Sequence, residues 1–566
     1  MKISFLLEIA VDKPFKALHE LFADKPEFGM HLAGDEYEFL AWGDPISSDR
    51  FVRELPSRCN AEFIVNNLHG HYYFLLHDKK HRELVAGSSL FSILPVYYCI
   101  REGQATLSGN VFTLGKKMGL NTIRERFVLE SLLFNYPLFN SSLIDGTKLL
   151  PSNSALALGN NGYHVRKHTA IQQWFSDDPE PWRKSTDRMA HHLLEAVEKY
   201  LPQEQYMTAL TGGFDGRTLT AAGLYHDRKF SCYCFGTDSS TDLKVAANIA
   251  GQTGIDFVPV ITDKEYVSGY SLDAGRRFIL GSSGIGTFSR AHYIYGASLL
   301  AGKTRYIVTG NFGSEVFRAV HNAGVMISPA LYDVFTSRNP EEAIERVRRS
   351  PVARFIDSGM LQSVLPGLLE DIEALPCFDS RYKNLTRNQQ FYVYVFEEIF
   401  RKYFGSEIVN QSEFVVNRTP FLDPFFLRAL FGTGLAGIHS GFFENNPLRR
   451  FKGQVLYATV IRKAAPQLGR FDTDRGYCPD DLLSYKGRLK IMAVRYKKKR
   501  QKTGSPYDPL GVKAAWRFNH RFYEELDVDG DIFNTDIVSL SGSGELNDEK
   551  ARLFSLVYSM HLLKNS

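Results

Sequence analysis

The sequence predicts a multidomain protein of mixed α/β and α+β class, in which an antiparallel β-sandwich is followed by a parallel sheet flanked by helices. The chain has 566 residues, a length that corresponds to about two to four domains. Short apolar runs separated by turn residues fill its first part. Strand-like and helix-like patterns alternate after residues 177–181, a polar stretch with prolines that is typical of a linker.

Residues 1–170 are expected to form the antiparallel domain. Apolar or aromatic runs there are separated by Gly, Asn, Asp and Lys, the pattern of packed antiparallel sheets. The strands expected from these runs are 63–65, 72–76, 83–87, 95–100 and 104–107, with a final hairpin of 156–158 and 163–165.

Residues 180–485 are expected to form the parallel-sheet domain. Met189, Leu193 and Val197 repeat at helical spacing, which predicts a first helix. Alternating strands and helices predict parallel βαβ units, whose ligands bind beyond the carboxyl ends of the strands. The expected strands are 206–210, 230–235, 257–261 and 306–308, and residues 340–484 are expected to be mainly helical.

Residues 486–566 are expected to form a basic segment and a tail of unknown role. Nine lysines and arginines and no acidic residue lie within 486–502, so the net charge of +4 belongs to this stretch and the rest of the chain is mildly acidic. Such a segment could follow nucleic-acid phosphates, a membrane surface, or an acidic peptide or carrier protein. We favour a solvated face and keep the acidic partner as a hypothesis. Nucleic acid is disfavoured, because only Tyr485 and Tyr496 offer rings for stacking.

A final helix is expected over residues 547–563, after a polar stretch at 539–544. Its apolar residues on one face include Leu553, Val557 and Met560. Docking onto the body of the protein is the favoured role, and contact with a partner is the alternative.

Composition indicates a folded protein without a membrane span. Hydrophobic residues make up 44% and charged residues 23% of the chain, as in globular proteins. No stretch reaches the ~18–20 uninterrupted apolar residues of a spanning helix. The six cysteines are scattered without zinc spacing, which favours reduced thiols and a cytoplasmic protein.

The most informative segment joins an expected strand to an expected helix and reads Thr211-Gly212-Gly213-Phe214-Asp215-Gly216-Arg217. Two glycines allow backbone N–H groups to approach an anion, and the helix N-terminus adds a favourable dipole. Asp215 is either a helix N-cap or a ligand for phosphate-bound Mg²⁺. The residues alone leave open whether this is an ordinary turn or a phosphate-binding loop.

This loop resembles the pyrophosphate-binding loop of the N-type ATP pyrophosphatases, usually Ser-Gly-Gly-x-Asp-Ser. The chain more broadly resembles the asparagine synthetase B family, which includes β-lactam synthetases and lasso-peptide macrocyclases. Similar segments recur in family order at residues 87–98, 134–151, 235–244 and 418–423. The resemblance implies an Ntn-hydrolase-like sandwich at the N-terminus and an adenine-nucleotide α-hydrolase-like (PP-loop) sheet after it.

The chain departs from the family at the expected glutaminase site. Glutamine-dependent members use a cysteine as residue 2, whereas this chain has Lys2 and no cysteine before Cys59. Ser88 and Ser89 stand where the family has Arg and Asp. The N-terminal domain is therefore expected to lack glutaminase activity, as in the β-lactam synthetase branch.

The family's second signature, Ser-Gly-Glu-Gly-Ser-Asp-Glu-Val-Phe, aligns without gaps to residues 309–317. Asn311 replaces the Glu that is thought to be a catalytic base, and Ser314 replaces the Asp that helps to hold Mg²⁺. Because Asn cannot take a proton from an amine, amide synthesis needs another base. Glu315, His292 and Tyr293 are candidates, although packing is the favoured role of the last two.

The resemblance implies ATP and Mg²⁺ as cofactors. Arg217 is expected to bind phosphate and to offset the missing Ser at position 216. Asp215 and Glu315 are the expected metal ligands, and Glu315 and Arg475 the expected catalytic residues, with Arg475 at the place of a family Lys. The residues expected to bind the nucleotide are Thr211, Gly212, Gly213, Asp215, Gly216, Arg217, Gly236 and Gly310.

The expected function is ATP-dependent, AMP-forming amide synthesis. A small-molecule or peptide carboxylate would be adenylated and attacked by ammonia or an amine, without ammonia from the chain's own glutamine hydrolysis. The alternative is a non-catalytic nucleotide-binding pseudoenzyme or assembly subunit.

Overall fold

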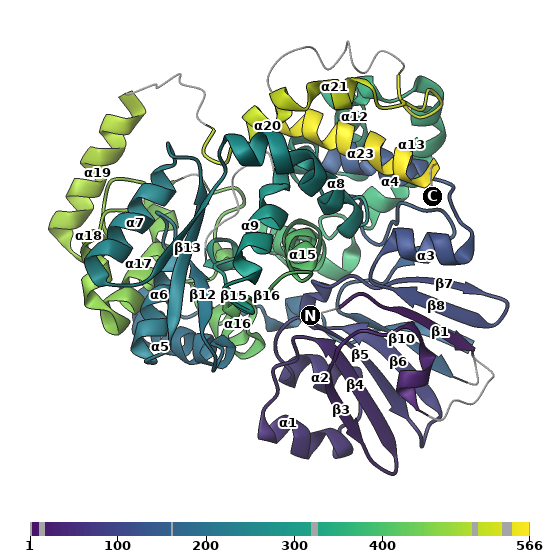
Figure 1. Ribbon diagram of the computed structural model, residues 1–566, viewed down its shortest axis with the longest axis horizontal. Helices are drawn as coiled ribbons and strands as arrows, with labels where there is room; N and C mark the ends of the chain where they lie inside the picture. Colours follow the sequence, from purple (N-terminus) through teal and green to yellow (C-terminus); the bar gives the residue numbers. More distant parts are fainter. Residues whose placement is uncertain are drawn as a thin grey trace.

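The computed structural model describes residues 3–10, 17–159, 162–317, 326–444, 446–500, 508–534 and 546–564. Figure 1 shows a β-rich N-terminal part at the lower right, a parallel sheet between helices at the left, and the last helices across the top. Lys2 and the polar stretch 539–544 lie outside the described residues.

The N-terminal part consists of two antiparallel sheets, which confirms this part of the predicted fold class. The first has the order β2 (Phe22–Asp24), β1 (Leu6–Ala10), β8 (Gln104–Ser108), β7 (Tyr97–Arg101) and β9 (Lys148–Leu149). The second has the order β11 (Gly162–Lys167), β10 (Ser154–Gly159), β6 (Glu83–Ser88), β5 (Tyr72–Asp78), β4 (Tyr37–Gly43) and β3 (Phe28–Ala33). Phe5, Trp42 and Tyr73 pack together in the core of this N-terminal part, with ring centroids 4.8–5.5 Å apart.

The strand predicted at residues 63–65 is wrong, because these residues form part of helix α2 (Ala61–Asn67). Asn60 caps this helix by accepting a hydrogen bond from the Phe63 N–H at 2.9 Å. A run of three apolar residues does not distinguish a strand from a buried helical turn, and the cap favours the helix. The other helices of this part are α1 (Asp49–Glu54), α3 (Val111–Met118) and α4 (Glu125–Phe134).

The predicted parallel sheet is confirmed and has five strands among the described residues. Their order is β14 (Phe257–Ile261), β13 (Phe230–Gly236), β12 (Tyr206–Ala209), β15 (Tyr306–Val308) and β16 (Val416–Arg418). The chain order reverses between β12 and β15, so their carboxyl ends form the topological switch point at which such sheets bind ligands. Strand β16 was missed, because three residues inside a largely helical region carry no periodicity.

Helices cover both faces of this sheet. Leu219 and Ala222 of α6 (Asp215–Tyr225) pack on one face, whereas Ala297 and Leu300 of α9 (His292–Ala301) pack on the other. Helices α5 (Trp182–Tyr200) and α17 (Pro447–Ala464) pack beside α6. The remaining α-helices of the described chain are α7 (Thr241–Thr253), α8 (Ser271–Gly281), α10 (Gly313–Phe317), α11 (Pro329–Thr336), α12 (Pro340–Arg348), α13 (Ser358–Glu373), α14 (Arg387–Tyr394), α15 (Phe400–Gln411), α16 (Pro424–Phe431), α18 (Pro479–Leu483), α19 (Tyr485–Arg500), α20 (Val512–Phe518), α21 (His520–Glu524) and α23 (Asp548–Lys564).

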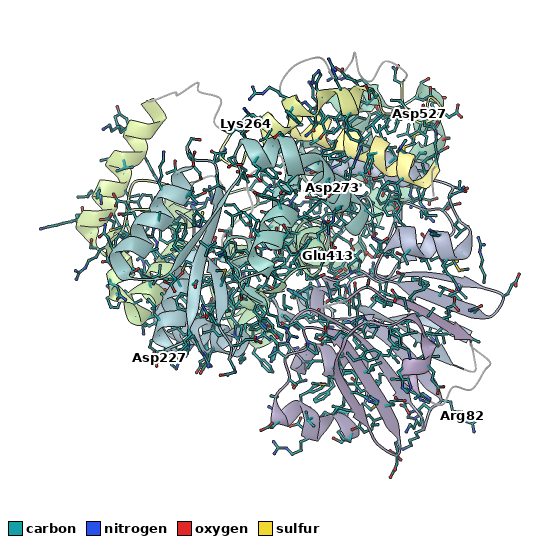
Figure 2. All side chains as sticks on the ribbon, in the orientation of Figure 1. Arg82, Asp227, Lys264, Asp273, Glu413 and Asp527 are labelled. Carbon is teal, nitrogen blue, oxygen red and sulfur yellow. The ribbon has the colours of Figure 1, made fainter. Side chains whose placement is uncertain are left out.

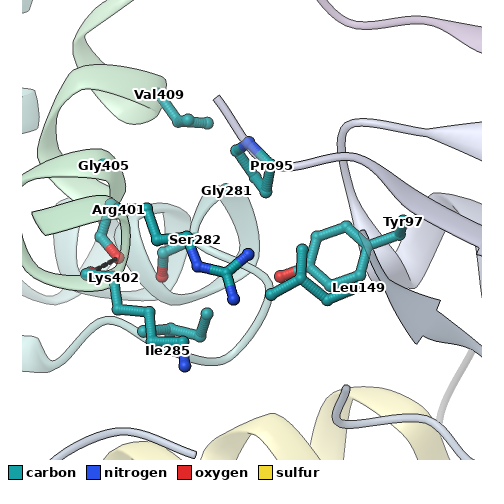
Figure 3. A pocket seen from close by; sticks show the side chains of 11 residues that line it. Pro95, Tyr97, Leu149, Gly281, Ser282, Ile285, Arg401, Lys402, Gly405 and Val409 are labelled. Atoms are coloured by element: carbon teal, nitrogen blue, oxygen red, sulfur yellow. Dashed lines mark hydrogen bonds between the residues drawn. The ribbon is translucent and has the colours of Figure 1, made fainter. Parts of the chain in front are cut away.

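Buried polar contacts join the two parts. Arg418, at the end of β16, forms a two-point ion pair with Asp44 at 2.8 and 3.0 Å. Nearby, His71 Nε2 lies 2.8 Å from Thr419 Oγ1. Figure 3 shows a small pocket at the junction, in which Arg401 of α15 projects toward Leu149 and Tyr97. The loops at the carboxyl ends of β12 and β15 therefore belong to a sheet that is held against the sandwich.

Helix α23 docks on the body of the protein, as expected for the final helix. Its Ser555 hydroxyl accepts the Phe288 N–H at 3.1 Å, and Arg552 donates to the Ile285 carbonyl at 2.5 Å. The helix also lies along α4 of the N-terminal part (Figure 1). It therefore holds both parts of the chain together.

Among the described residues, no helix combines the length and the apolar composition needed to cross a membrane.

Candidate functional site

Two loops meet at the switch point of the parallel sheet. One follows β12 and contains Gly212, Gly213 and Asp215, and the other follows β15 and contains Gly310. A Cβ added to Gly310 would lie 2.6 Å from the Asp215 Cβ. Only glycine permits this approach, so Gly310 brings the end of β15 against the first turn of α6.

The glycine loop is held by acceptors from its own surroundings. The Gly212 N–H donates to Asp242 Oδ1 at 2.9 Å, and the Gly213 N–H donates to Thr211 Oγ1 at 3.2 Å. Burial raises the pKa of Asp242, while the hydrogen bond from Gly212 opposes this rise. Two of the N–H groups predicted to bind phosphate are thus already satisfied, and a phosphate would have to displace or share these acceptors.

The structure gives Gly216 and Arg217 structural roles. A Cβ at position 216 would lie 2.0 Å from the Ala209 carbonyl oxygen, so this position must be glycine where α6 begins against β12. Arg217 is fully buried and donates to the carbonyls of Phe471 and Asp472 at 2.5 and 3.1 Å. The predicted phosphate contact of Arg217 does not fit this orientation, because its guanidinium is used to hold the loop 471–477.

Arg475 is brought to the site by this tethered loop. The Asp474 N–H donates to the Gly212 carbonyl at 3.2 Å, which pins the segment to the glycine loop. The Arg475 side chain is 35% exposed and lies beside Asp474, with 3.9 Å between Nε and Oδ1. Arg475 thus remains available to a ligand at the mouth of the pocket.

A small pocket lies between these loops and helix α17. Asp215 and Arg475 both line it, as predicted for residues that act on one ligand. Its described lining residues are Gly213, Phe214, Asp215, Ser314, Phe317, Gly453, Gln454, Tyr457 and Arg475. Asp215 Oδ1 is buried and receives no hydrogen bond from the described residues. A carboxylate oxygen in this state is suited to a cation or a donor from a ligand.

Ser314, and not Glu315, faces Asp215. The Ser314 hydroxyl donates to Asp215 Oδ2 at 2.8 Å. Glu315 is not among the described residues that line the pocket. The predicted pairing of Asp215 with Glu315 as metal ligands therefore does not fit, because consecutive helical residues point about 100° apart.

Asn311 points away from this pocket into a buried polar cluster. Its amide donates to Glu407 Oε1 at 3.2 Å, and Arg290 forms an ion pair with the other oxygen of Glu407 at 2.8 Å. Burial raises the pKa of Glu407, whereas Arg290 opposes the rise. The carboxylate is held by these donors, so the cluster stabilises the region behind the loop.

His292 and Tyr293 pack beside the same cluster, as favoured from the sequence. Burial, with Arg290 adding to it, lowers the pKa of His292 to about 3. Burial also raises the pKa of Tyr293. Neither side chain lines the pocket at Asp215.

Gly236 lies at the end of β13, outside the pocket. Ser240 caps helix α7, and a Cβ added to Gly236 would lie 2.6 Å from the Cβ of this serine. The next residue, Thr237, donates its N–H to the Pro509 carbonyl at 2.8 Å. The segment that precedes α20 thus covers the end of β13, where the predicted nucleotide contact of Gly236 would be made.

A second group of candidate metal ligands lies near the site but contains its own cation. Asp472, Cys478 and Asp481 bring their ligand atoms within 4.8 Å of one another. Lys490 Nζ lies 2.7 Å from Asp481 and 3.6 Å from Asp472. The ammonium group neutralises these carboxylates, and the cluster fastens α19 to the body.

Several contributors were not predicted from the sequence. Gln454 and Tyr457 line the pocket from α17, and Asp474 reaches the glycine loop from a distant segment. Asp474 is the direct neighbour of Arg475, whereas no local sequence pattern distinguishes Gln454 and Tyr457 from the rest of their helix. Glu407 lies in a helix whose sequence pattern reveals only burial.

No protein-family model matches the sequence. No curated protein matches it either. A solved structure of glutamine phosphoribosylpyrophosphate (PRPP) amidotransferase from B. subtilis, complexed with ADP and GMP, aligns with 57% of this chain and 71% of its own, at 8% sequence identity and a TM-score of 0.16. A similarity at this TM-score supports no argument about the chain.

Proposed function

We propose that the cleft at the ends of β12 and β15 binds ATP and that the protein is an ATP-dependent, AMP-forming amide ligase. The proposal treats the two parts of the chain as an Ntn-hydrolase-like sandwich and a PP-loop domain. The sequence resemblance supports this function, and so does the pocket that Asp215 and Arg475 both line.

The buried Asp215 Oδ1 is the observation that carries the proposal. It lies at the switch point, in the pocket that Arg475 also lines, and receives no hydrogen bond from the described residues. Helix α6 begins at Asp215, so its positive dipole end is directed at the same place. A negatively charged nucleotide with a divalent cation satisfies both features.

The residues fit Mg²⁺ only when phosphate supplies most of its ligands. Asp215 is the one carboxylate among the described lining residues, and Mg²⁺ in nucleotide sites takes one or two carboxylates together with phosphate oxygens and water. Asp215 would hold the ion through Oδ1, and the ion would neutralise phosphate charge.

The proposed reaction has two steps. A carboxylate oxygen of the substrate attacks the α-phosphorus of ATP, forming an acyl-adenylate and releasing pyrophosphate. Ammonia or an amine then attacks the acyl carbon, AMP leaves, and the amine proton passes to solvent or to the substrate. Arg475 would stabilise the negative charge that develops at the reacting carboxyl and phosphate groups.

We also propose that the chain does not hydrolyse glutamine. Five of the six cysteines are buried, and burial also raises the pKa of the partly buried Cys59 thiol to about 11. A protonated thiol is a poor nucleophile at neutral pH. Ammonia or an amine must therefore reach the cleft from another source.

A second candidate function is nucleotide binding without catalysis. It is favoured by the Ser314 hydrogen bond to Asp215, because a hydroxyl group stands where a second carboxylate would be needed to bind Mg²⁺. The Asn311 contact with Glu407 favours it too, because neither group then reaches the pocket as a base.

Exchange of labelled pyrophosphate into ATP distinguishes these functions. The assay is run with a panel of amino acids, small carboxylic acids and short peptides, and Asp215→Ala is the control. Carboxylate-dependent exchange that the variant abolishes supports the ligase. Measurable ATP binding without exchange supports the second function, and a folded protein that does not bind ATP contradicts both.

A further inference from the structure

Helix α19 (Tyr485–Arg500) has two apolar faces, and one of them is exposed. On the inner face Ile491 is fully buried. On the opposite face the exposed fractions are 80% for Tyr485, 51% for Leu489, 54% for Met492 and 60% for Tyr496. Figure 1 places the helix at the left edge of the molecule, next to α18. We name Tyr485, Leu489, Met492 and Tyr496 the outer seam.

The outer seam follows the spacing of a coiled coil. Its members are separated by four, three and four residues, the spacing of alternating d and a positions in a heptad repeat. Two apolar positions in seven make a narrow stripe, which suits one partner helix.

Basic residues flank the seam at the positions that select coiled-coil partners. With Tyr485 at d, Lys486 falls at e, and Arg488 and Arg495 fall at g. Lys486 and Arg488 are exposed, while Arg495 is partly buried and lies over the Phe451 ring at 4.4 Å. No acidic residue occurs within 486–502, so the flanks have a single sign.

We propose that the outer seam of α19 docks an acidic amphipathic helix of another protein. Glutamates flanking the apolar face of such a helix would pair with Lys486 and Arg488, and its apolar residues would cover the seam. A second copy of α19 would place basic flanks against basic flanks, which is repulsive. A membrane surface is disfavoured, because insertion needs a wider apolar face than a stripe of two positions in seven.

The inference does not depend on the proposed ligase function, because the seam lies outside the pocket at Asp215. Its first test uses the full chain and a fluorescent three-heptad peptide with Leu at a and d and Glu at e and g. The matched peptide has Lys at e and g. We expect binding of the Glu peptide at about 0.05 M salt, at least tenfold weaker binding at about 0.5 M, and no binding of the Lys peptide.

Variants then assign the binding to the seam. Leu489→Ser with Met492→Ser should weaken the Glu peptide at least tenfold, and Lys486→Glu with Arg488→Glu should abolish its preference over the Lys peptide. Leu299→Ser is the apolar control, since Leu299 is 46% exposed on α9. Arg82→Glu is the charge control, because Figure 2 shows Arg82 at the far end of the molecule from α19. Both controls should bind like the unaltered chain.

Three outcomes would overturn the proposal. The first is no binding of the Glu peptide at low salt by a chain with an unchanged circular dichroism spectrum. The second is binding that the seam variants leave unchanged. The third is binding to phosphatidylserine vesicles, lost in the seam variants, without binding to the peptide.

Discussion

Ser314 donates its hydroxyl to Asp215 Oδ2 across 2.8 Å, at the point where the loops after β12 and β15 meet. In the family that the sequence resembles, this position carries a second carboxylate for Mg²⁺. A serine needs no cation beside Asp215, because its proton satisfies one oxygen. This hydrogen bond satisfies Oδ2 alone, because Asp215 Oδ1 receives no hydrogen bond from the described residues.

Restoring the carboxylate should make the site depend on Mg²⁺. We expect Ser314→Asp to lower the melting temperature in the absence of metal, because two carboxylates would be in contact. Mg·ATP should bind this variant at least about tenfold more tightly than the unaltered chain. Thermal unfolding and calorimetric titration measure these effects, with Ser314→Asn as the uncharged control. Equal behaviour of the Asp and Asn variants would contradict the assigned geometry.

Replacing Arg217 should reduce stability. Arg217→Lys keeps the charge but cannot reach both the Phe471 and Asp472 carbonyls, so we expect a loss of about 2 kcal/mol in unfolding free energy. Denaturant unfolding measures it, and Arg228→Lys, just beyond α6, is the control with a smaller expected effect. Unchanged stability together with weakened ATP binding would instead indicate a phosphate contact.

Removing the buried carboxylate Glu398 should disrupt the junction between the two parts. Glu398 accepts hydrogen bonds from Arg401 and Lys402, both at 2.6 Å, and burial lowers the pKa of Lys402 to about 8. Glu398→Gln leaves two buried cations without their counter-charge, which costs about 3–5 kcal/mol.

The control for this change is Lys167→Gln. It removes a more exposed pair with Glu397 and should cost less than about 1 kcal/mol. Thermal unfolding compares the two variants, and similar small shifts for both would show that the buried cluster does not stabilise the junction.

Acid should destabilise the protein partly through His71. Burial lowers its folded-state pKa to about 4, below the ordinary value of about 6.5. Between these values the unfolded chain binds more protons, so stability falls as the pH decreases from about 6.5 toward 4. His71→Asn should flatten the decrease in melting temperature over this range. His191→Asn, at an exposed site, should not change it, and the idea fails if the two variants have the same pH dependence.

The two kinds of sheet could be predicted from the sequence, whereas the pairing of short strands and the orientation of individual side chains could not. Strand β12, the glycine loop and α6 follow from local pattern, because a buried strand, two glycines and a helical period are adjacent. The apolar run at residues 63–65 predicts a strand, whereas the Asn60 cap favours the helix that forms there. Strand β16 exists only through its pairing with β15, which no local pattern reveals.

The same limit applies to the site. Asp215 and Arg475 were predicted together, and both line the pocket. Ser314 and Glu315 are neighbours, and only the rotation of α10 determines which of them faces Asp215. Asp242 reaches the Gly212 N–H from 30 residues away, a contact that depends on how β13 and α7 pack.

Titration of Mg·ATP into the full chain and into Asp215→Asn is the most direct test of the central claim, that the cleft at β12 and β15 is a nucleotide site. We predict saturable binding to the unaltered chain and at least about tenfold weaker binding to the variant, because the amide removes the charge that faces the ion. No binding by a folded unaltered chain, or the same affinity in both proteins, would contradict the account.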